Sequence, residues 1–130
     1  MKRLLLLLGL LVLLIAPAKM SAMESEKAQE NPVFRILKVS GEKGNYEVSG
    51  EARPIMGVFY YTVEDGHNEF ISEMKLYHKT KFPEWAPFSI TIDIDKKKLP
   101  VKGSLMLNLY ERSKKDNSII HTYPVQLEQF

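Results

Sequence analysis

Cysteine is missing from all 130 residues, and its absence excludes whole classes of structure and chemistry. The chain can form no disulfide, no thiolate nucleophile, no Cys-ligated zinc or iron–sulfur site, and no lipid-modified N-terminal cysteine. Glycine and proline number only seven each, which excludes a collagen-like or low-complexity chain. The length predicts one domain rather than two with separate cores.

Long hydrophobic runs are also lacking, except at the N-terminus. Met1–Arg3 is a short basic stretch, Leu4–Ile15 is a Leu-rich run of 12 residues, and small residues follow it. A helix of this length spans about 18 Å, which is too little for a hydrocarbon core of about 30 Å. We therefore expect residues 1–22 to be a secretory signal peptide cleaved after Ala18 or Ala22, with an uncleaved membrane anchor as the alternative.

An excess of charge of one sign is absent once this segment is removed. The whole chain holds 18 Lys+Arg and 16 Asp+Glu, and Lys2, Arg3 and Lys19 leave with the signal peptide, so 15 positive residues remain against 16 negative ones. A nearly neutral chain gives no support for binding to nucleic acid or to an anionic membrane. Export without disulfides fits a bacterial cell envelope, so we expect a secreted or extracytoplasmic protein with no membrane span in the mature chain.

The rest of the chain divides into a polar segment and a β-rich segment. Residues 23–32 are polar and charged, which predicts a flexible tether, and residues 33–130 form the domain. Seven runs rich in Val, Ile, Tyr and Phe predict seven strands. The first four cover residues 33–39, 45–53, 55–64 and 68–77, the fifth begins at residue 87, and the last two cover 104–111 and 119–127. Phe88–Asp95 alternates apolar and polar residues, which indicates a strand with one buried face. This pattern predicts an all-β antiparallel sandwich, with a small barrel as the alternative architecture.

Three segments in a fixed order carry a resemblance to a known family. They are Val48–Arg53, which contains a Gly-x-Ala motif, Trp85–Phe88, and Gly103–Ser118, which ends in Glu-x-Ser-x-x-Asp-Asn-Ser. Residues 48–127 thereby resemble Gmad2, the immunoglobulin-like domain associated with bacterial spore germination proteins. The resemblance implies an immunoglobulin-like sandwich, a bacterial origin and a cell-envelope setting, and it brings no established catalytic residues.

The chain departs from this family pattern at two places. Ile55 and Met56 stand where many members carry an aromatic–acidic pair, so a role shared through that acidic residue is not carried over. Asn117 stands where glycine is usual, and asparagine tolerates the left-handed backbone conformation that such a turn needs. We therefore expect the turn at residues 113–118 to survive the change.

The titratable side chains form no recognisable catalytic or metal site. His67 lies among carboxylates in the turn 65–69, but this segment lacks the ligand pattern of a calcium loop, and a solvated hairpin turn is favoured. Asp93 and Asp95 share one side of a strand, where charged surface is favoured over a hydrolytic pair. His121 is expected to be half-buried and hydrogen-bonded. The sequence predicts no catalytic residue, no cofactor and no metal ion.

Aromatic residues provide the best candidates for a binding surface. Tyr60 and Tyr61 are adjacent in a predicted strand, so their side chains point to opposite faces, and the neighbours of each place Tyr61 inside and Tyr60 outside. Tyr60, Tyr77 and Trp85 are therefore the candidate surface for a ligand or partner.

The predicted function is that of an exported, non-catalytic binding module of the bacterial cell envelope. Its partner would be an envelope protein or a cell-wall glycan, and the family resemblance implies a link to sporulation or germination. The alternative is a small secreted inhibitor of a protease or another hydrolase, which would present a loop such as Lys79–Pro87 to the enzyme.

Overall fold

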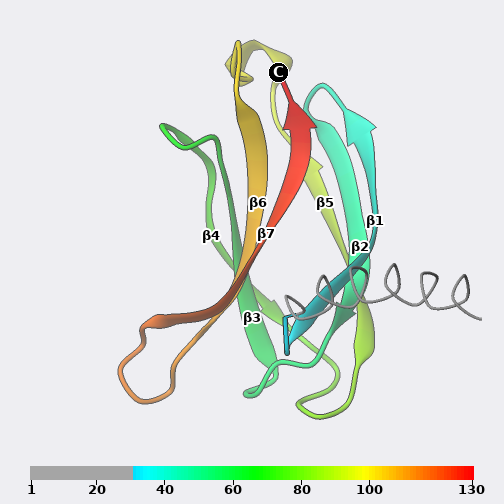
Figure 1. Ribbon diagram of the computed structural model, residues 1–130, viewed down its shortest axis with the longest axis vertical. Coiled ribbons are helices and arrows are strands. Elements are labelled where there is room, and N and C mark those ends of the chain that lie inside the picture. Colours follow the sequence, from blue (N-terminus) through cyan, green and yellow to red (C-terminus); the bar gives the residue numbers. More distant parts are fainter. Residues whose placement is uncertain (1–30) are drawn as a thin grey trace, which may run out of the picture. The chain divides into compact units, whose positions relative to one another are not determined.

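A computed structural model describes residues 31–130, and it contains seven strands and one short 3-10 helix (Figure 1). The elements are β1 (Phe34–Glu42), β2 (Asn45–Ala52), β3 (Val58–Glu64), β4 (Glu69–Tyr77), β5 (Ala86–Asp93), η1 (Lys96–Lys98), β6 (Ser104–Arg112) and β7 (Ile119–Gln129). The expected signal peptide, residues 1–22, lies outside the described residues. Within residues 31–130, no helix is long and apolar enough to cross a membrane.

The strands form two antiparallel sheets, which confirms the predicted immunoglobulin-like sandwich rather than a barrel. The three-stranded sheet has the order β1-β2-β5, and the four-stranded sheet has the order β4-β3-β6-β7. The chain crosses between the sheets after β2, after β4 and after β5 (Figure 1). Contacts between β1 and β7 close one side of the sandwich, so β4 and β5 are the edge strands of the other side.

The core lies between the two sheets and is built from the inward face of each strand. Alternation in β5 buries Ile90 and Ile92, and alternation in β6 buries Leu105, Leu107 and Leu109, as the sequence predicts. The core cluster begins at Val33 and ends at Leu127. Residues 31–130 therefore contain a complete hydrophobic core, which is what a domain needs to fold by itself.

The first hairpin is tighter than the sequence indicates. β1 continues through Gly41 to Glu42, which pairs with Asn45, so the turn is reduced to Lys43 and Gly44. Both turn residues have positive φ, +52° and +102°, which suits the right-handed twist of a two-residue hairpin. The pairing of β1 with β2 is irregular at one point, because β1 has an extra residue between Ile36 and Lys38, opposite Gly50 and Ser49.

The third strand starts later than predicted, at Val58 instead of Ile55. The Gly57 N–H donates to the Pro54 carbonyl oxygen at 3.3 Å, so residues 54–57 form a β-turn. Gly57 has a φ of +75°, a conformation that a β-strand cannot continue through. Ile55 and Met56 therefore occupy the tip of a turn, where polar residues are usual.

The domain begins at Asn31, within the segment that the sequence assigns to the tether. Its side-chain oxygen accepts the N–H groups of Val33 and Phe34, and its amide group lies 3.3 Å from the carbonyl oxygens of His121 and Thr122. These bonds fix the entry of the chain at the end of the sandwich that contains the β2–β3, β4–β5 and β6–β7 loops (Figure 1). This end is called the loop end below.

Two side chains connect the sheets at opposite ends of the sandwich. The buried Tyr46 hydroxyl, on β2, donates to Glu128 Oε1 of β7 at 2.6 Å and accepts the Gly44 N–H at 3.1 Å. At the loop end, His78 Nε2 lies 3.2 Å from the Ala52 carbonyl oxygen and 3.1 Å from that of Ala86. Both of these partners are acceptors, so this nitrogen carries the proton and ties the end of β4 to the three-stranded sheet.

The Tyr46 bond predicts a pH-dependent stability. Burial, aided by the hydrogen bond to Glu128, raises the pKa of Tyr46 from 10.0 to about 12. Because the folded-state pKa lies above the unfolded value, this stabilisation is complete below about pH 10 and is lost as the pH rises towards 12. Tyr46→Phe should lower the free energy of unfolding by about 1 kcal/mol at pH 8.

This difference between Tyr46→Phe and the wild type should shrink at pH 11. Guanidinium unfolding of both proteins at the two pH values measures it, and pH effects that both proteins share cancel in the difference. A difference that does not change with pH would contradict the assignment.

Candidate functional site

The outer face of the four-stranded sheet holds two of the three predicted surface residues. Tyr61 is buried against the core and Tyr60 is half-buried on the outside, which confirms the predicted orientations. Tyr60 pairs across the sheet with Lys75 of β4 and with Tyr110 of β6, and Val58 pairs with Tyr77. Because paired residues lie on the same face, Tyr60 and Tyr77 share the outer surface.

A compact aromatic and charged cluster lies at the centre of this face. The rings of Tyr60 and Tyr110 are stacked, with centroids 5.8 Å apart and an interplanar angle of 17°. The Arg112 guanidinium carbon lies 5.9 Å from the Tyr60 centroid and 5.8 Å from that of Tyr110. Glu73 of β4 accepts hydrogen bonds from the Tyr110 hydroxyl and from Arg112, whose Nη2 lies 2.7 Å from Glu73 Oε1. The cluster therefore connects three neighbouring strands.

The pKa shifts of these groups follow from their contacts. Burial and the hydrogen bond to Glu73 raise the pKa of Tyr110 well above its usual value. The hydrogen bond from Arg112, followed by that from Tyr110, lowers the pKa of Glu73 below its usual range. The phenol thus stays neutral while the carboxylate and guanidinium stay charged, so the cluster keeps one protonation state at neutral pH.

Tyr77 is highly exposed, with 78% of its surface accessible. Lys75 Nζ lies 5.1 Å from the Tyr77 ring centroid, within the range of a cation–π contact. A large aromatic side chain with so little burial contributes little to the core, which makes Tyr77 available for a partner.

Trp85 lies in a different environment, in the loop before β5. The guanidinium carbon of Arg35 lies 4.0 Å from the Trp85 ring centroid and that of Arg53 lies 4.3 Å from it. Arg53 also lies 4.5 Å from the Phe82 centroid, and Arg35 pairs with Glu51 at 2.7 Å. The structure therefore places Trp85 within an arginine cluster at the loop end, whereas Tyr60 and Tyr77 lie on the four-stranded sheet.

A buried carboxyl group lies behind the outer face, where β6 meets β7. Glu111 is only 3% exposed. Its Oε1 accepts the Ile55 N–H at 2.8 Å, and its Oε2 lies 2.7 Å from His121 Nδ1. His121 is half-buried and hydrogen-bonded, as predicted, and its φ of +56° marks an irregular stretch of β7. Glu111 thus holds the β2–β3 turn to β6 and β7.

The segment that follows Glu111 forms a self-contained turn. The Ser113 N–H donates to the Ser118 carbonyl oxygen at 2.8 Å, and Asp116 Oδ1 accepts both the N–H and the hydroxyl of Ser118. Asn117 has a φ of +64°, so it adopts the left-handed conformation that the sequence predicts. Its carbonyl oxygen accepts a 2.7 Å bond from Arg112, which connects the turn to the outer-face cluster.

The sequence motifs described above fall within a match to a known protein family. The model of the Gmad2 family, described as an immunoglobulin-like domain of bacterial spore germination, matches residues 37–118. The chain belongs to the Gmad2 family. No curated protein and no solved structure matches it. In this Gmad2 domain, the Glu-x-Ser-x-x-Asp-Asn-Ser pattern has a structural explanation. Its glutamate, Glu111, makes the buried carboxyl contact, and its remaining residues form the turn at residues 113–118.

The Gly-x-Ala motif of this Gmad2 domain also has a packing role. A Cβ atom on Gly50 would lie 2.3 Å from the Arg35 carbonyl oxygen, so only glycine fits beside β1. Ala52 is completely buried, and its carbonyl oxygen is one of the two that face His78. The motif therefore joins β1, β2 and the end of β4.

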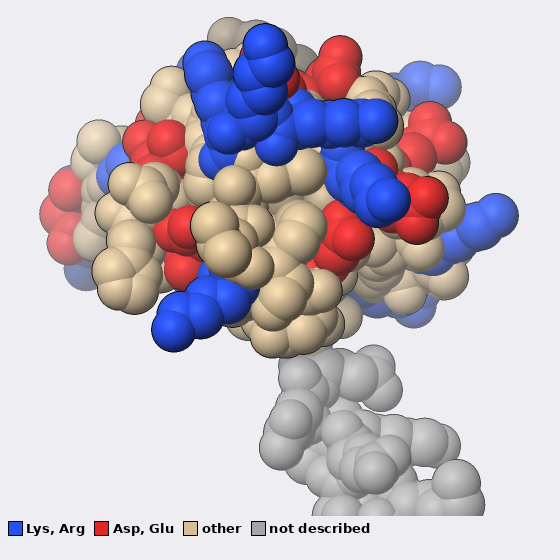
Figure 2. Space-filling model, turned by 90° about the horizontal axis from the view of Figure 1, so that it is seen from above, with Lys and Arg blue, Asp and Glu red and all other residues tan. Residues whose placement is uncertain are grey.

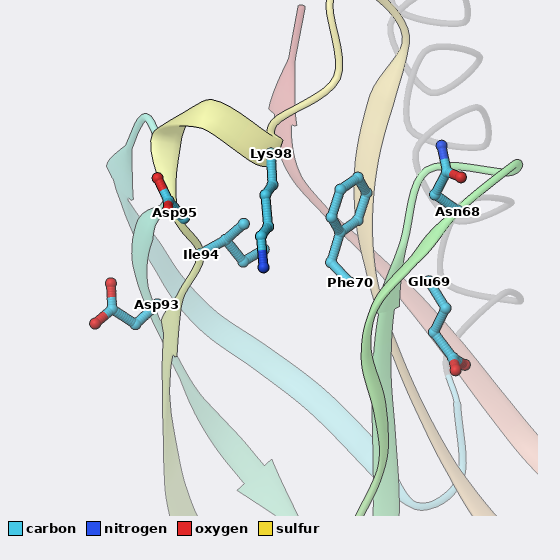
Figure 3. Close-up of a pocket in the computed structure, with 7 residues that line it drawn as sticks. All are labelled: Asn68, Glu69, Phe70, Asp93, Ile94, Asp95 and Lys98. Atoms are coloured by element: carbon cyan, nitrogen blue, oxygen red, sulfur yellow. The ribbon is translucent and has the colours of Figure 1, made fainter.

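A hollow of about 490 Å³ lies between the edge strands β4 and β5, at the end opposite the loop end (Figure 3). Phe70 and Ile94 point towards each other across it, with the Lys98 chain between them (Figure 3). Asp93 and Asp95 point away from the hollow (Figure 3). Asp93 accepts a hydrogen bond from the Asn45 side chain, and Asp95 accepts the Lys97 N–H at the start of η1. Both carboxylates therefore have structural partners on an exposed surface, as favoured from the sequence.

The predicted hairpin turn around His67 is present. Asp65 Oδ1 accepts the N–H groups of His67 and Asn68 at 2.8 and 2.7 Å, and these bonds lower the pKa of Asp65. Within residues 31–130, no group of three His, Asp or Glu side chains is placed to hold a metal ion.

Sequence reasoning missed Arg112, Tyr110 and Glu73 as members of the surface cluster. Tyr110 could have been found, because it alternates with the buried Leu105, Leu107 and Leu109 and so points outward. Glu73 could not have been found from the sequence. The register between β3 and β4 shifts after Tyr61, and this shift changes which residues lie opposite each other.

Glu111 provides a direct test of how the site is held. Glu111→Ala leaves the Ile55 N–H and His121 without their acceptor, so the free energy of unfolding should fall by about 3 kcal/mol. Glu47→Ala, at an exposed position of β2, should change it by less than about 0.5 kcal/mol. Guanidinium unfolding at pH 7 measures both variants, and equal effects would contradict the proposed role of Glu111.

Proposed function

We propose that this Gmad2 domain is an exported, non-catalytic interaction module of the bacterial cell envelope. Its partner is an envelope protein, which it binds through the outer face of the four-stranded sheet, in a process linked to sporulation or germination. Membership of the Gmad2 family supports the setting, and the outer-face cluster supports the mode of binding.

The observation that carries this proposal is the arrangement of Tyr60, Tyr77 and Arg112 on one sheet face. Tyrosine and arginine are the residue types that dominate the energetics of protein interfaces. Arg112 is already held by Glu73 and by the Asn117 carbonyl oxygen, so little side-chain entropy is lost when a partner binds. The cluster is therefore preorganised.

A protein partner fits this domain better than a cell-wall glycan. Sugars stack on the open face of an aromatic ring, and a tryptophan is the ring best suited to this role. The only tryptophan, Trp85, has two guanidinium carbons within 4.3 Å of its ring centroid, which leaves little room for a sugar. Tyr60 is likewise stacked on Tyr110.

The test compares retention of residues 23–130 by immobilised envelope proteins and by purified peptidoglycan. Tyr60→Ser/Tyr77→Ser should weaken retention by the envelope proteins at least about tenfold, the loss of a little more than one kcal/mol at an interface. Leu37→Ser is the matched control, because Leu37 is an exposed apolar residue of the other sheet. This control should bind like the wild type.

Other results would overturn the proposal in distinguishable ways. Retention by peptidoglycan alone would assign a glycan-binding module, and unchanged binding after alanine substitution of Tyr60, Tyr77 and Trp85 would exclude all three as the surface. Stoichiometric loss of a protease's or another hydrolase's activity, abolished by substitutions in the loop Lys79–Pro87, would instead favour an inhibitor.

A further inference from the structure

Two large apolar side chains lie at the tip of the β2–β3 turn. Ile55 and Met56 are 48% and 47% exposed, although positions at the tip of a turn usually hold Gly, Asn, Asp or Ser. The turn itself is well anchored, because the Ile55 N–H donates to the buried Glu111 and the Gly57 carbonyl oxygen accepts the His78 N–H at 2.8 Å. The fold thus presents two apolar side chains to solvent in a fixed position.

The neighbouring loop enlarges this apolar tip. The Phe82 N–H donates to the Pro54 carbonyl oxygen at 3.0 Å, which places Phe82 beside the turn, and Phe82 is 47% exposed. Tyr77 lies opposite Val58, directly after the turn. Ile55, Met56, Phe82 and Tyr77 are therefore neighbours at the loop end, and they are called the apolar tip.

The loops of the end that carries the apolar tip have an excess of positive charge. The three loops of this end, residues 53–57, 78–85 and 113–118, contain five Lys or Arg and two Asp or Glu, a net charge of +3. The cations are Arg53, Lys79, Lys81, Lys114 and Lys115, and the anions are Glu84 and Asp116. Arg53 stacks on Phe82, and the Lys81 side chain lies close to Gly57 of the turn. Residues 23–130 are therefore nearly neutral in total but carry a local excess of positive charge at the loop end.

We propose that the loop end docks on the surface of a phospholipid bilayer that carries anionic headgroups. Apolar side chains at a tip enter the boundary between headgroups and acyl chains, a tyrosine suits the interfacial level, and surrounding lysines pair with anionic headgroups. The first described residue, Asn31, is also held at this end, by bonds to the His121 and Thr122 carbonyl oxygens. This inference concerns a surface that shares only Tyr77 with the outer face proposed for the protein partner.

The experiment uses residues 23–130, so that the N-terminal apolar run cannot itself insert into lipid. This protein is mixed with vesicles of phosphatidylcholine, with or without phosphatidylglycerol. Binding to the anionic vesicles is expected, with weaker binding at high salt. Ile55→Ser/Met56→Ser and Lys79→Glu/Lys81→Glu should each reduce the partition coefficient about tenfold or more.

The opposite end of the sandwich supplies matched controls. Its β5–β6 connection carries Lys96–Lys98, Lys102 and the 95% exposed Val101, and Figure 2 shows Lys and Arg side chains gathered on one side of this end. Val101→Ser removes an exposed apolar side chain there and Lys97→Glu/Lys98→Glu reverses two charges, and each should alter binding by less than about twofold. A general attraction of lysines to lipid would affect both ends equally and would overturn the proposal.

Trp85 provides a second readout, because it is the only tryptophan and shares Arg53 with Phe82. Its fluorescence should be quenched by lipids brominated near the glycerol end of their acyl chains. Absence of binding to anionic vesicles at low salt would overturn the proposal. Loss of retention by envelope proteins in Ile55→Ser/Met56→Ser, without any vesicle binding, would also overturn it and assign the apolar tip to a protein partner.

Discussion

The rest of the loop end depends on the contacts that the buried Glu111 carboxyl group makes with the Ile55 N–H and with His121. One oxygen holds the Ile55 N–H and the other faces His121, so a single side chain of β6 fixes the β2–β3 turn and the irregular start of β7. A buried carboxyl group is costly unless its oxygens are hydrogen-bonded, and here both of them are. The same strand continues into Arg112, which contacts the outer-face tyrosines and the turn at residues 113–118. The two surfaces proposed for binding are therefore joined through adjacent residues of one strand.

These two surfaces differ in chemistry. The outer face of the four-stranded sheet carries tyrosines and the Arg112–Glu73 pair, which suit a protein, whereas the loop end carries an apolar tip and an excess of lysines. Ile55 and Met56 give this chain an exposed apolar turn tip. A module with both surfaces would hold a protein partner close to a membrane, in keeping with the cell-envelope function proposed above.

The sequence predicts the sandwich well, because each strand buries one face and a period of two is a strong signal. Phe88–Asp95 and Leu105–Leu109 show this alternation, and the structure buries the predicted faces. The sequence predicts local backbone conformation less well. Ile55 has a high strand propensity and Met56 is apolar, so the sequence extends the strand through them, whereas the positive φ of Gly57 ends it. Contacts between distant residues, such as those of Glu111 with Ile55 or of Trp85 with two arginines, depend on register and crossover, which residue spacing alone does not contain.

Amide hydrogen exchange at Ile55 tests the central role of Glu111 most directly. The Ile55 side chain is half exposed at the tip of a turn, yet its N–H donates to a buried carboxyl oxygen. We predict that this amide exchanges as slowly as the amides of β6, while the adjacent Met56 amide, which has no acceptor among residues 31–130, exchanges at the rate of an open turn. Equally fast exchange at Ile55 and Met56 would contradict the conclusion that Glu111 fixes the turn and, with it, the apolar tip.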